Sequence, residues 1–361
     1  MRICVDAQGL GTRPTGAGKA LACLLRQLRQ DAPGHEYLPL APGDRTGWRL
    51  PQQLWWEQVR LPWQARRRGA DLLHVAGGTS APVARRTRLV MTLHDIAPTR
   101  HPELLPHARS RWYWGRWVPY TARFADAVLV PSLSTKRDLL ALTPIPESRI
   151  HVVPLATPLD DPGPVSAAAV EDCRRRYGLT APYLLYVGTI DRRKDHPTLL
   201  EALRRLDAPL TLALAGTLIR GRTDFPERVE RLGLRDRVRV LGYVPEADLV
   251  PLYQGAAAFV YPSLYEGFGL PVLEAMACGT PVVTYDATSL PEVAGEAALL
   301  LAPPWTPEAL ADAIRRLLDD EALRLELRHR GLEQAKRFSW AETARGTVAV
   351  YEAVGGGGGA V

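Results

Sequence analysis

The sequence predicts an α/β protein that is built from two doubly wound, Rossmann-like domains. Its 361 residues are enough for two domains of roughly 150 residues each, together with connecting and terminal segments. Short apolar segments alternate with longer segments of helical periodicity, which is typical of parallel sheets covered by helices on both faces. A segment rich in proline and turn-forming residues, 154–166, interrupts this alternation, and the same pattern then starts again.

The first half of the chain contains five segments that we expect to form strands, because they are rich in leucine or β-branched residues and too short for helices. They are residues 1–6, 71–75, 88–93, 126–130 and 150–153. The helices expected between them are residues 17–30, 55–68, 108–122 and 133–142.

The second half repeats this organisation without detectable sequence repetition. Its expected strands are residues 183–187, 210–215, 237–241, 257–261 and 281–285. Its expected helices are residues 196–206, 224–232, 246–255 and 271–277. Two later helices are predicted from their first residues: Thr306 precedes Pro307 at a helix start, and Ser339 with Glu342 forms a capping-box pattern.

These patterns divide the chain into five segments. The boundaries are 1–155 for the first domain, 156–180 for a linker and lead-in helix, 181–338 for the second domain, 339–354 for a last helix that crosses back to the first domain, and 355–361 for a glycine-rich tail. Open α/β sheets bind ligands at the carboxyl ends of their strands, so a central cleft between the two domains is the expected active site.

The composition excludes several classes of protein. Apolar residues make up 46% and charged residues 23% of the chain, which is typical of globular proteins and not of disordered, collagen-like or coiled-coil chains. The four cysteines are isolated in the sequence, so we expect neither a zinc site nor a disulfide framework. No signal peptide follows Met1 and no apolar run reaches about 18 residues, which predicts a cytoplasmic protein.

Positive charge is concentrated in the first domain. Residues 1–155 hold 22 Lys and Arg against 11 Asp and Glu, a formal charge of +11, whereas residues 156–361 hold 23 against 28, a formal charge of −5. The two domains are therefore expected to bind different partners.

Residues 262–281 (PSLYEGFGLPVLEAMACGTP) form the most informative motif of the chain. Gly267 and Gly269 follow a predicted strand and permit a ligand to approach the backbone closely. Pro271 then suits the first turn of a helix, whose free amides and dipole form a site for anions or hydroxyl groups.

Two carboxylates accompany this loop. Glu266 lies just before it and Glu274 lies about one turn into the following helix. A carboxylate accepts paired hydroxyl hydrogen bonds, which suits the diols of sugars and ribose. The alternative is that both glutamates lie on a solvated helix face, which the inserted Gly-Phe-Gly-Leu-Pro sequence disfavours.

The motif resembles the signature of retaining nucleotide-sugar glycosyltransferases with the GT-B fold, of the family 4 or group 1 type. The resemblance extends over residues 1–353. Further segments that carry it are residues 186–196, 242–256, 289–293 and 338–340, and in the first domain residues 16–18 and 93–95.

The resemblance implies that Glu274 binds the ribose hydroxyls of the donor nucleotide and that Glu266 binds hydroxyls of the transferred sugar. The loop residues that it places against the sugar and the phosphates are Gly267, Phe268, Gly269 and Leu270. The nucleotide-sugar itself is a substrate, and no cofactor is expected.

Arg193 and Lys194 match the basic pair of the family, which stabilises the charge of the leaving diphosphate. The alternative for such a cluster is a solvated loop. Gly188 and Val244 are placed beside the nucleotide by the same resemblance. Many relatives carry an arginine directly after the strand glycine, where Thr189 stands here, so which arginine bears that charge stays open.

In the first domain, the resemblance implies that Gly16 and Gly18 form a loop that faces the diphosphate. It also gives His94 a catalytic role beside Glu266 and the basic pair, either touching the transferred sugar or organising the reaction centre. A lone histidine is otherwise more often structural. The sequence around Gly18 lacks the first glycine and the final hydroxyl residue of a P-loop, which excludes a kinase or ATPase.

No Asp-x-Asp sequence occurs in the chain, so we expect a reaction without a metal ion. Both glutamates are assigned to binding, and no residue stands out as the covalent nucleophile of a two-carboxylate glycosidase. The resemblance implies front-face attack with retention of configuration, in which a donor phosphate oxygen deprotonates the acceptor.

Seven of the nine tryptophans precede residue 120, and they are interleaved with arginines in residues 48–68 and 109–123. This pattern can mark a surface that touches anionic membrane. The alternative is packing, with Trp55, Trp56 and Val59 facing the core. No recognition motif accompanies the charge, so nucleic-acid binding is not expected.

The sequence thus predicts a cytoplasmic glycosyltransferase that moves a sugar, first of all mannose from GDP-mannose, to a cell-surface polysaccharide or a lipid-linked glycan. Two alternatives stay open. One is a GT-B-fold phosphorylase or disaccharide synthase that acts on soluble sugars, and the other is a catalytically silent subunit that binds sugar nucleotides.

Overall fold

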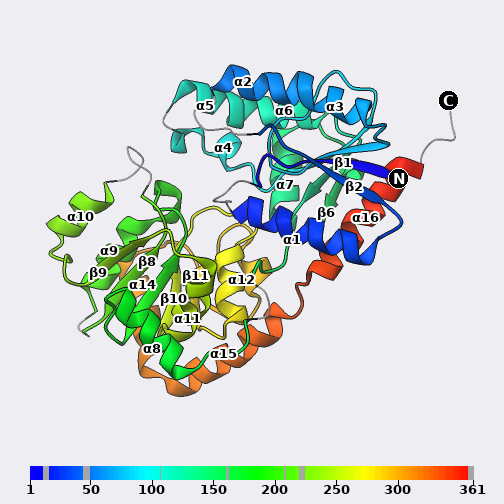
Figure 1. The fold of residues 1–361 in the computed structure, drawn as a ribbon. Coiled ribbons are helices and arrows are strands. Elements are labelled where there is room, and N and C mark those ends of the chain that lie inside the picture. The colour runs from blue at the N-terminus through cyan, green and yellow to red at the C-terminus, as the bar shows by residue number, and fades with distance from the viewer. Residues whose placement is uncertain are drawn as a thin grey trace. The chain divides into compact units, whose positions relative to one another are not determined.

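The computed structural model describes residues 1–10, 16–43, 49–105, 107–159, 162–206, 209–218 and 224–356. Contacts within the chain divide it into two compact units (Figure 1). The first unit comprises the chain up to Pro158 together with the segment that begins at Phe338, and the second unit is Leu159–Arg337. Each unit is an α/β structure around a six-stranded parallel sheet, so the predicted fold class is confirmed.

The first sheet has the strand order β2-β1-β3-β4-β5-β6, with every pair of neighbours parallel. Its strands are β1 (Arg2–Asp6), β2 (Glu36–Leu40), β3 (Leu72–Val75), β4 (Arg88–Thr92), β5 (Ala127–Val130) and β6 (Ile150–Val152). The α-helices of this unit are α1 (Gly16–Asp31), α2 (Leu50–Trp55), α3 (Leu61–Arg67), α4 (Ala97–Arg100), α5 (Ala108–Trp112), α6 (Val118–Ala122), α7 (Leu133–Leu142) and α16 (Trp340–Gly356).

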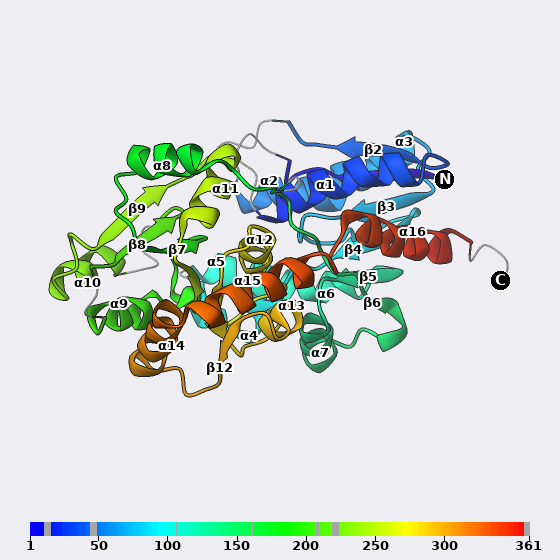
Figure 2. The same cartoon turned by 90° about the horizontal axis from the view of Figure 1, so that it is seen from below.

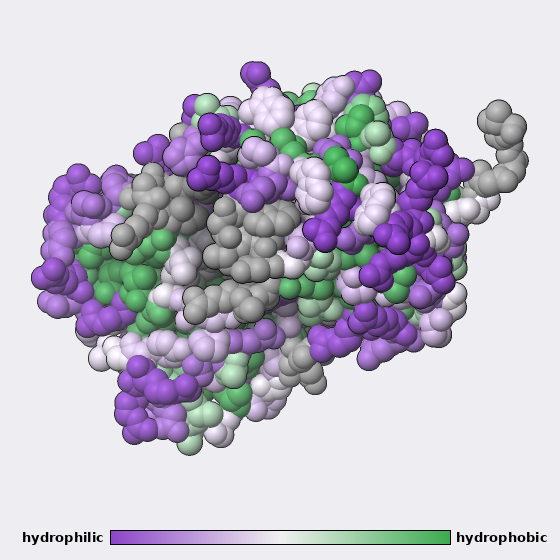
Figure 3. All heavy atoms as spheres, turned by 45° about the horizontal axis from the view of Figure 1, so that its top comes forward, coloured by the Kyte–Doolittle hydropathy of each residue, from purple (hydrophilic) through white to green (hydrophobic). Residues whose placement is uncertain are grey.

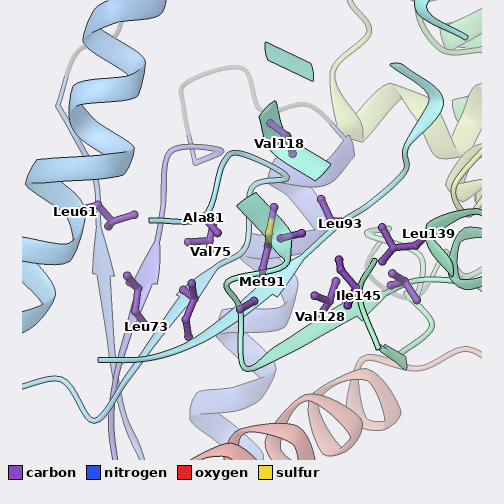
Figure 4. Packing of buried hydrophobic residues seen from close by; sticks show 14 of the residues in the cluster. Leu61, Leu73, Val75, Ala81, Met91, Leu93, Val118, Val128, Leu139 and Ile145 are labelled. Carbon is purple, nitrogen blue, oxygen red and sulfur yellow. The ribbon is translucent and has the colours of Figure 1, made fainter. Parts of the chain in front are cut away.

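A hydrophobic core lies on each face of the first sheet, because successive side chains of a strand point to opposite faces. On one face, Leu73 and Met91 pack with residues of α3, α6 and α7 (Figure 4). On the other face, Leu72 and Val90 pack against α1 and α16. Figures 1 and 2 show α16, the last helix of the chain, beside α1.

The second sheet has the strand order β12-β11-β10-β7-β8-β9 and is also parallel. Its strands are β7 (Tyr183–Val187), β8 (Thr211–Ala215), β9 (Val238–Gly242), β10 (Ala258–Tyr261), β11 (Val282–Tyr285) and β12 (Leu299–Leu301). Its α-helices are α8 (Ala167–Arg176), α9 (His196–Arg204), α10 (Phe225–Arg231), α11 (Glu246–Gly255), α12 (Leu270–Ala277), α13 (Leu290–Ala294), α14 (Pro307–Asp319) and α15 (Glu321–Ala335).

Two strands were not predicted, and both lie at the edge of a sheet. β2 contains Pro39, which cannot donate a hydrogen bond and therefore argues against a strand in the interior of a sheet. β2 tolerates the proline because it is an edge strand, which pairs with β1 along one side and, among the described residues, has no neighbouring strand along the other. β12 has three residues, too few for a recognisable pattern.

Two predicted helices are interrupted by π-helical turns. Trp56–Arg60 forms the turn η1 between α2 and α3, and Tyr113–Trp117 forms the turn η3 between α5 and α6. Each turn ends two residues before a proline, Pro62 or Pro119. Proline lacks the amide and clashes with the carbonyl four residues earlier, so the wider π turn accommodates it.

Two of the predicted helix caps are confirmed. The Thr306 hydroxyl accepts the Ala309 amide and the Ser339 hydroxyl accepts the Glu342 amide, each at 3.2 Å. Helix α16 extends to Gly356, and the rest of the predicted tail lies outside the described residues. No helix in the described ranges is both long and apolar enough to cross a membrane.

The packing alternative for the tryptophan-rich helix is wrong for two of its three residues. Trp56 is fully buried, but Trp55 and Val59 are each 53% exposed. Trp63 is 52% exposed on the same helical segment. Trp48, which belongs to the same sequence cluster, lies outside the described residues.

Candidate active site

The strand order of the second sheet creates a switch point between β7 and β10. From β7 the chain proceeds outward to β8 and β9, and it then returns to the other side of β7 to form β10. The loops after these two neighbouring strands therefore diverge and leave a crevice at the carboxyl ends of the strands, where open α/β sheets bind ligands. The predicted basic loop follows β7, and the predicted glycine-rich loop follows β10.

The basic loop is held in place by its own backbone and by Asp191. Gly188 has a φ of 147° and its amide donates to the Ala215 carbonyl at 2.9 Å, so the loop starts against the last residue of β8. The Asp191 carboxylate accepts the Arg193 amide at 3.0 Å and caps the short 3-10 turn Arg192–Lys194. Arg192 is exposed, whereas Lys194 is buried.

The structure brings Lys194, Arg193 and Glu266 together. The Lys194 ammonium forms an ion pair with the Glu266 carboxylate, and the Arg193 guanidinium lies 3.5 Å from the other carboxylate oxygen. Arg193 also donates to the Tyr265 carbonyl at 2.9 Å. The hydroxyl groups of Tyr261 and Ser263 donate to Glu266 at 3.0 and 2.5 Å.

These contacts set the charge of the cluster. Burial by itself would raise the pKa of Glu266, but the charges of Lys194 and Arg193 outweigh burial and lower this pKa to about 2. Glu266 is therefore a carboxylate at neutral pH. The basic loop, Asp191 to Lys194, and Glu266 together hold three basic and two acidic side chains, a formal net charge of +1 that favours an anionic ligand.

The glycine-rich loop is positioned by two hydroxyl residues that follow β11. The Glu266 amide donates to the Thr288 hydroxyl at 2.9 Å, and the Ser289 hydroxyl donates to the carbonyls of Glu266 and Phe268 at 3.0 and 2.8 Å. Thr288 has a φ of 50°, a strained conformation for a β-branched residue. The strained residue, Thr288, is thus the one whose hydroxyl fixes the start of the glycine-rich loop at Glu266.

Gly269 connects the loop to α12. Its φ is 110°, a conformation that favours glycine, and a Cβ atom there would also displace a methyl group of Leu290, 2.9 Å away. Gly267 precedes it and Phe268 is buried. Leu270 is the first residue of α12. Pro271 has no amide, and the amides of Val272 and Leu273 donate to the Gly269 carbonyl at 3.0 and 3.3 Å.

Glu274 lies on α12, one turn after Leu270. Its side chain is buried and accepts a hydrogen bond from the Tyr253 hydroxyl of α11 at 2.8 Å. Val244 is also buried and lies in the loop between β9 and α11. Both residues thus belong to the carboxyl side of the second sheet, but no described contact joins Val244 to the Glu266 cluster.

The remaining predicted residues belong to the first unit. Gly16 and Gly18 open α1, and His94 follows β4. The His94 Nε2 atom lies 3.1 Å from the Ala76 carbonyl, and burial lowers the pKa of His94, which favours the neutral ring. Asp95 accepts the Ala97 amide at 3.0 Å and caps the loop that follows.

Four residues that support the site were not identified from the sequence. In the sequence, Tyr261 and Tyr253 cannot be distinguished from other aromatic residues that pack in a strand or a helix. Ser263 and Thr288 lie in loops, and a left-handed conformation at threonine has no local sequence signal. Among the described residues, no group of three or more His, Cys, Asp or Glu side chains could hold a metal ion.

Two family profiles match the chain. The profile of glycosyl transferases group 1 matches residues 172–338, and that of glycosyltransferase family 4 matches residues 22–161. The O-antigen chain mannosyltransferase B of Escherichia coli is 39% identical over 275 residues, which cover 74% of this chain and 71% of that protein. The chain belongs to the group 1 glycosyltransferases. It is accordingly an enzyme that transfers glycosyl groups.

Other relatives place this glycosyltransferase within a varied group. The serotype-specific mannosyltransferase WbdA of Escherichia coli is 31% identical over 272 residues, but the match covers 71% of this chain and only 32% of that longer protein. Among solved structures, sucrose-phosphate synthase from Thermosynechococcus elongatus superposes with a TM-score of 0.76 at 25% identity, over 98% of each chain. These similarities support the predicted GT-B fold.

Proposed function

We propose that this glycosyltransferase moves mannose from GDP-mannose to a cell-surface polysaccharide or a glycolipid, with retention of the anomeric configuration. The observation that carries the proposal is the cluster of Lys194, Arg193 and Glu266 at the switch point of the second sheet. It combines net positive charge for a diphosphate with a carboxylate for sugar hydroxyls. The choice of mannose is supported by the mannosyltransferase that is 39% identical.

In the proposed reaction, the acceptor hydroxyl oxygen bonds to the anomeric carbon as the bond from that carbon to the diphosphate oxygen breaks. The electron pair of this bond remains on the diphosphate, and the acceptor proton passes to a phosphate oxygen. Arg193, Lys194 and the backbone amides of residues 268–270 stabilise the growing negative charge. Glu266 holds the sugar, and Glu274 holds the ribose.

A panel of UDP-, GDP- and dTDP-sugars tests the donor proposal. GDP-mannose is expected to raise the melting temperature most and to release GDP in the presence of acceptor. Glu274→Ala should weaken nucleotide binding by about tenfold, because it removes a charge-assisted hydrogen bond. If no nucleotide sugar stabilised the protein, the proposal would be wrong, and an unchanged affinity of Glu274→Ala would remove the ribose assignment.

We also propose that the reaction needs no metal ion, because the basic side chains and the amides of the glycine-rich loop supply the positive charge that a divalent cation would provide. Turnover should be unchanged after dialysis against EDTA. Lost turnover that magnesium or manganese restores would contradict this part of the proposal.

A second candidate is a synthase that acts on a soluble sugar. It is favoured by the structural similarity to sucrose-phosphate synthase. Turnover of soluble mono- and disaccharide acceptors, compared with the same glycans attached to a lipid, distinguishes the two candidates. Nucleotide binding without transfer to any acceptor would instead favour a silent binding subunit.

The first unit carries an exposed apolar stripe, which we define as Trp55, Val59 and Trp63. Each of these side chains is 52–53% exposed. The guanidinium groups of Arg60 and Arg67 lie over the rings of Trp55 and Trp63 at 5.7 and 4.8 Å. Figure 3 shows hydrophilic and apolar residues interspersed on the surface. Exposed aromatics beside arginines suit the boundary of an anionic bilayer, so we propose a cytoplasmic enzyme with peripheral membrane contact.

Sedimentation with vesicles tests this contact. The wild-type protein should bind phosphatidylglycerol vesicles and release them at high salt, because each basic residue near the surface contributes about 1 kcal/mol. Replacing all three stripe residues by serine should reduce binding at least about tenfold. Leu133→Ser, which removes a leucine that is 56% exposed on α7, is the control. Equal loss in both variants would contradict the assignment.

A further inference from the structure

We propose that two buried tyrosines are positioning residues, each of which orients one of the two glutamates that hold the donor. Tyr261 orients Glu266, the glutamate assigned to the sugar, and Tyr253 orients Glu274, the glutamate assigned to the ribose. This inference rests on the proposed glycosyl transfer. It adds that the first tyrosine acts on the transferred sugar and the second on the nucleotide.

The Tyr261 hydroxyl bridges the ion pair of Lys194 and Glu266. It donates to Glu266 Oε1 at 3.0 Å and accepts from the Lys194 ammonium at 2.5 Å. A hydroxyl group can donate and accept at the same time, whereas the edge of a phenylalanine ring would do neither. Tyr261 is fully buried on β10, so the position of the carboxylate is tied to the place of this ring in the sheet.

The two oxygens of the Glu266 carboxylate have different surroundings. Oε1 accepts from Lys194, Tyr261 and the Ser263 hydroxyl. Oε2 receives the Arg193 guanidinium at 3.5 Å, which is the outer limit of a hydrogen bond. Oε1 is therefore the anchored oxygen, and Oε2 is the oxygen that can accept a sugar hydroxyl. Removing the Tyr261 hydroxyl loosens the anchor and thus the orientation of Oε2.

Tyr253 makes the corresponding contact with Glu274. Tyr253 lies on α11 and is fully buried, and its hydroxyl donates to Glu274 Oε2 at 2.8 Å. Glu274 lies on α12, so this hydrogen bond fixes the carboxylate of one helix against the other helix. A carboxylate has about four acceptor sites, so Glu274 can hold this hydrogen bond and ribose hydroxyls together.

The two tyrosines belong to one row of packed aromatic rings. Phe259 of β10 stacks on Tyr261 with the ring centroids 5.7 Å apart, and its ring lies 5.4 Å from that of Tyr253. Tyr186 of β7 also stacks on Tyr261, at 5.6 Å. Aromatic pairs at such distances have preferred geometries, so the row keeps both hydroxyls in place. Replacing either tyrosine by phenylalanine retains the ring and removes only the hydroxyl.

Binding of GDP to the full-length protein, measured by calorimetry, tests the role of Tyr253. We expect Tyr253→Phe to raise the Kd of GDP about fivefold, because Glu274 is no longer fixed, and Tyr261→Phe to change it less than about twofold. Tyr183→Phe is the matched control. It removes another buried hydroxyl of the same sheet, which donates to the Leu252 carbonyl at 2.7 Å, and it should leave the Kd unchanged.

Turnover of GDP-mannose, with either an acceptor or water receiving the mannose, tests the role of Tyr261. Tyr261→Phe should lower kcat/KM at least about tenfold. Ser263→Ala, which removes another donor to Oε1, should lower it as well. The double variant Tyr261→Phe with Glu266→Gln should be no slower than Glu266→Gln alone, because the tyrosine acts through the carboxylate. A general loss of packing would instead add to the effect of Glu266→Gln.

Several results would overturn the positioning roles. They are unchanged GDP binding in Tyr253→Phe, unchanged turnover in Tyr261→Phe, additive losses in the double variant, and losses in Tyr183→Phe that equal those of the other two variants. The proposed function fails separately, when no nucleotide sugar stabilises the wild-type protein. If another nucleotide sugar is the donor, that sugar and its nucleoside diphosphate take the place of GDP-mannose and GDP as the probes.

Discussion

Glu266 is a buried carboxylate that two basic side chains keep ionised. Moving such a group out of water is costly, and its attraction to Lys194 and Arg193 offsets this cost only while the pairing is intact. These ion pairs and the hydrogen bonds from Tyr261 and Ser263 organise the cluster without a ligand. This preorganisation is the feature of the site that mutation can measure most directly.

We predict that Lys194→Ala lowers the free energy of unfolding by about 3–5 kcal/mol, because Glu266 is left buried with its main partner removed. The matched control is Lys336→Ala, which removes the exposed i,i+3 pair with Glu333 and should cost at most about 1 kcal/mol. Urea unfolding measures both values. Equal effects of the two substitutions would show that the buried pair contributes no more than a surface pair.

Glu57, which is fully buried in the first unit, behaves in the opposite way, because the groups that donate to its carboxyl are neutral. They are the hydroxyls of Tyr113 and Ser80 and the side-chain amide of Gln53. Burial raises the pKa of Glu57 from 4.5 to about 7, so between these pH values the unfolded chain loses a proton that the folded protein retains. The free energy of unfolding therefore falls as the pH rises through this window.

Glu57→Gln removes this titration. We predict that the stability of the variant relative to the wild-type protein rises between pH 4.5 and 7, by about 3 kcal/mol at most. Urea unfolding across this pH range provides the measurement. A difference that stays constant with pH would mean that the folded protein releases this proton as readily as the unfolded chain.

At the scale of elements, the loops after strands determine what the sheets can bind. Glycines permit two such loops of the second unit to touch. The amides of Gly188 and Ile190 donate to the carbonyls of Ala215 and Thr217 at 2.9 and 3.1 Å, which joins the basic loop after β7 to the segment after β8. A Cβ atom at Gly216 would overlap the carbonyl oxygen of Gly188.

We predict that Gly216→Ala lowers the free energy of unfolding by at least about 2 kcal/mol, because the overlap is with backbone and cannot be relieved by a side-chain rotation. It should also weaken nucleotide binding, since the basic loop must shift. Gly34→Ala, where a Cβ atom would meet nothing within 4 Å, should change stability by less than about 0.5 kcal/mol. Thermal unfolding with and without GDP measures both effects.

At the scale of the whole molecule, the chain has two compact units with separate cores. All residues proposed to hold the nucleotide, other than Gly16 and Gly18, belong to the second unit. A ligand stabilises only the structure that binds it, so nucleotide binding is expected to act mainly on that unit.

We predict two calorimetric unfolding transitions, of which GDP raises mainly one. At a concentration of 100 times its Kd, GDP should add about 2.7 kcal/mol to the free energy of unfolding of that unit. The shift should be smaller in Glu274→Ala at the same concentration. Hydrogen exchange identifies the unit, and protection confined to the first unit would contradict the assignment.

Much of the fold was predictable because it is encoded locally. Ten of the strands were predicted because each is a short apolar run in the sequence. The helix caps at Thr306 and Ser339 were predictable because each is formed by residues within one helical turn. The edge strands β2 and β12 and the π turns η1 and η3 were not predictable in the same way. The proline in β2 and the prolines after η1 and η3 indicate that the regular structure is disturbed there. They do not tell whether an edge strand or a π turn results, because that depends on how the surrounding elements pack.

The sequence by itself determined the two α/β units, the uneven charge and the glycine-rich loop with its two glutamates, because periodicity, composition and short motifs are properties of neighbouring residues. Only the tertiary structure decided that Lys194 pairs with Glu266, 72 residues away, and that Glu57 meets Tyr113, 56 residues away. Strand order brings such residues together, and strand order depends on how whole elements bury their apolar faces. The charges and hydrogen bonds of the candidate active site arise from that packing.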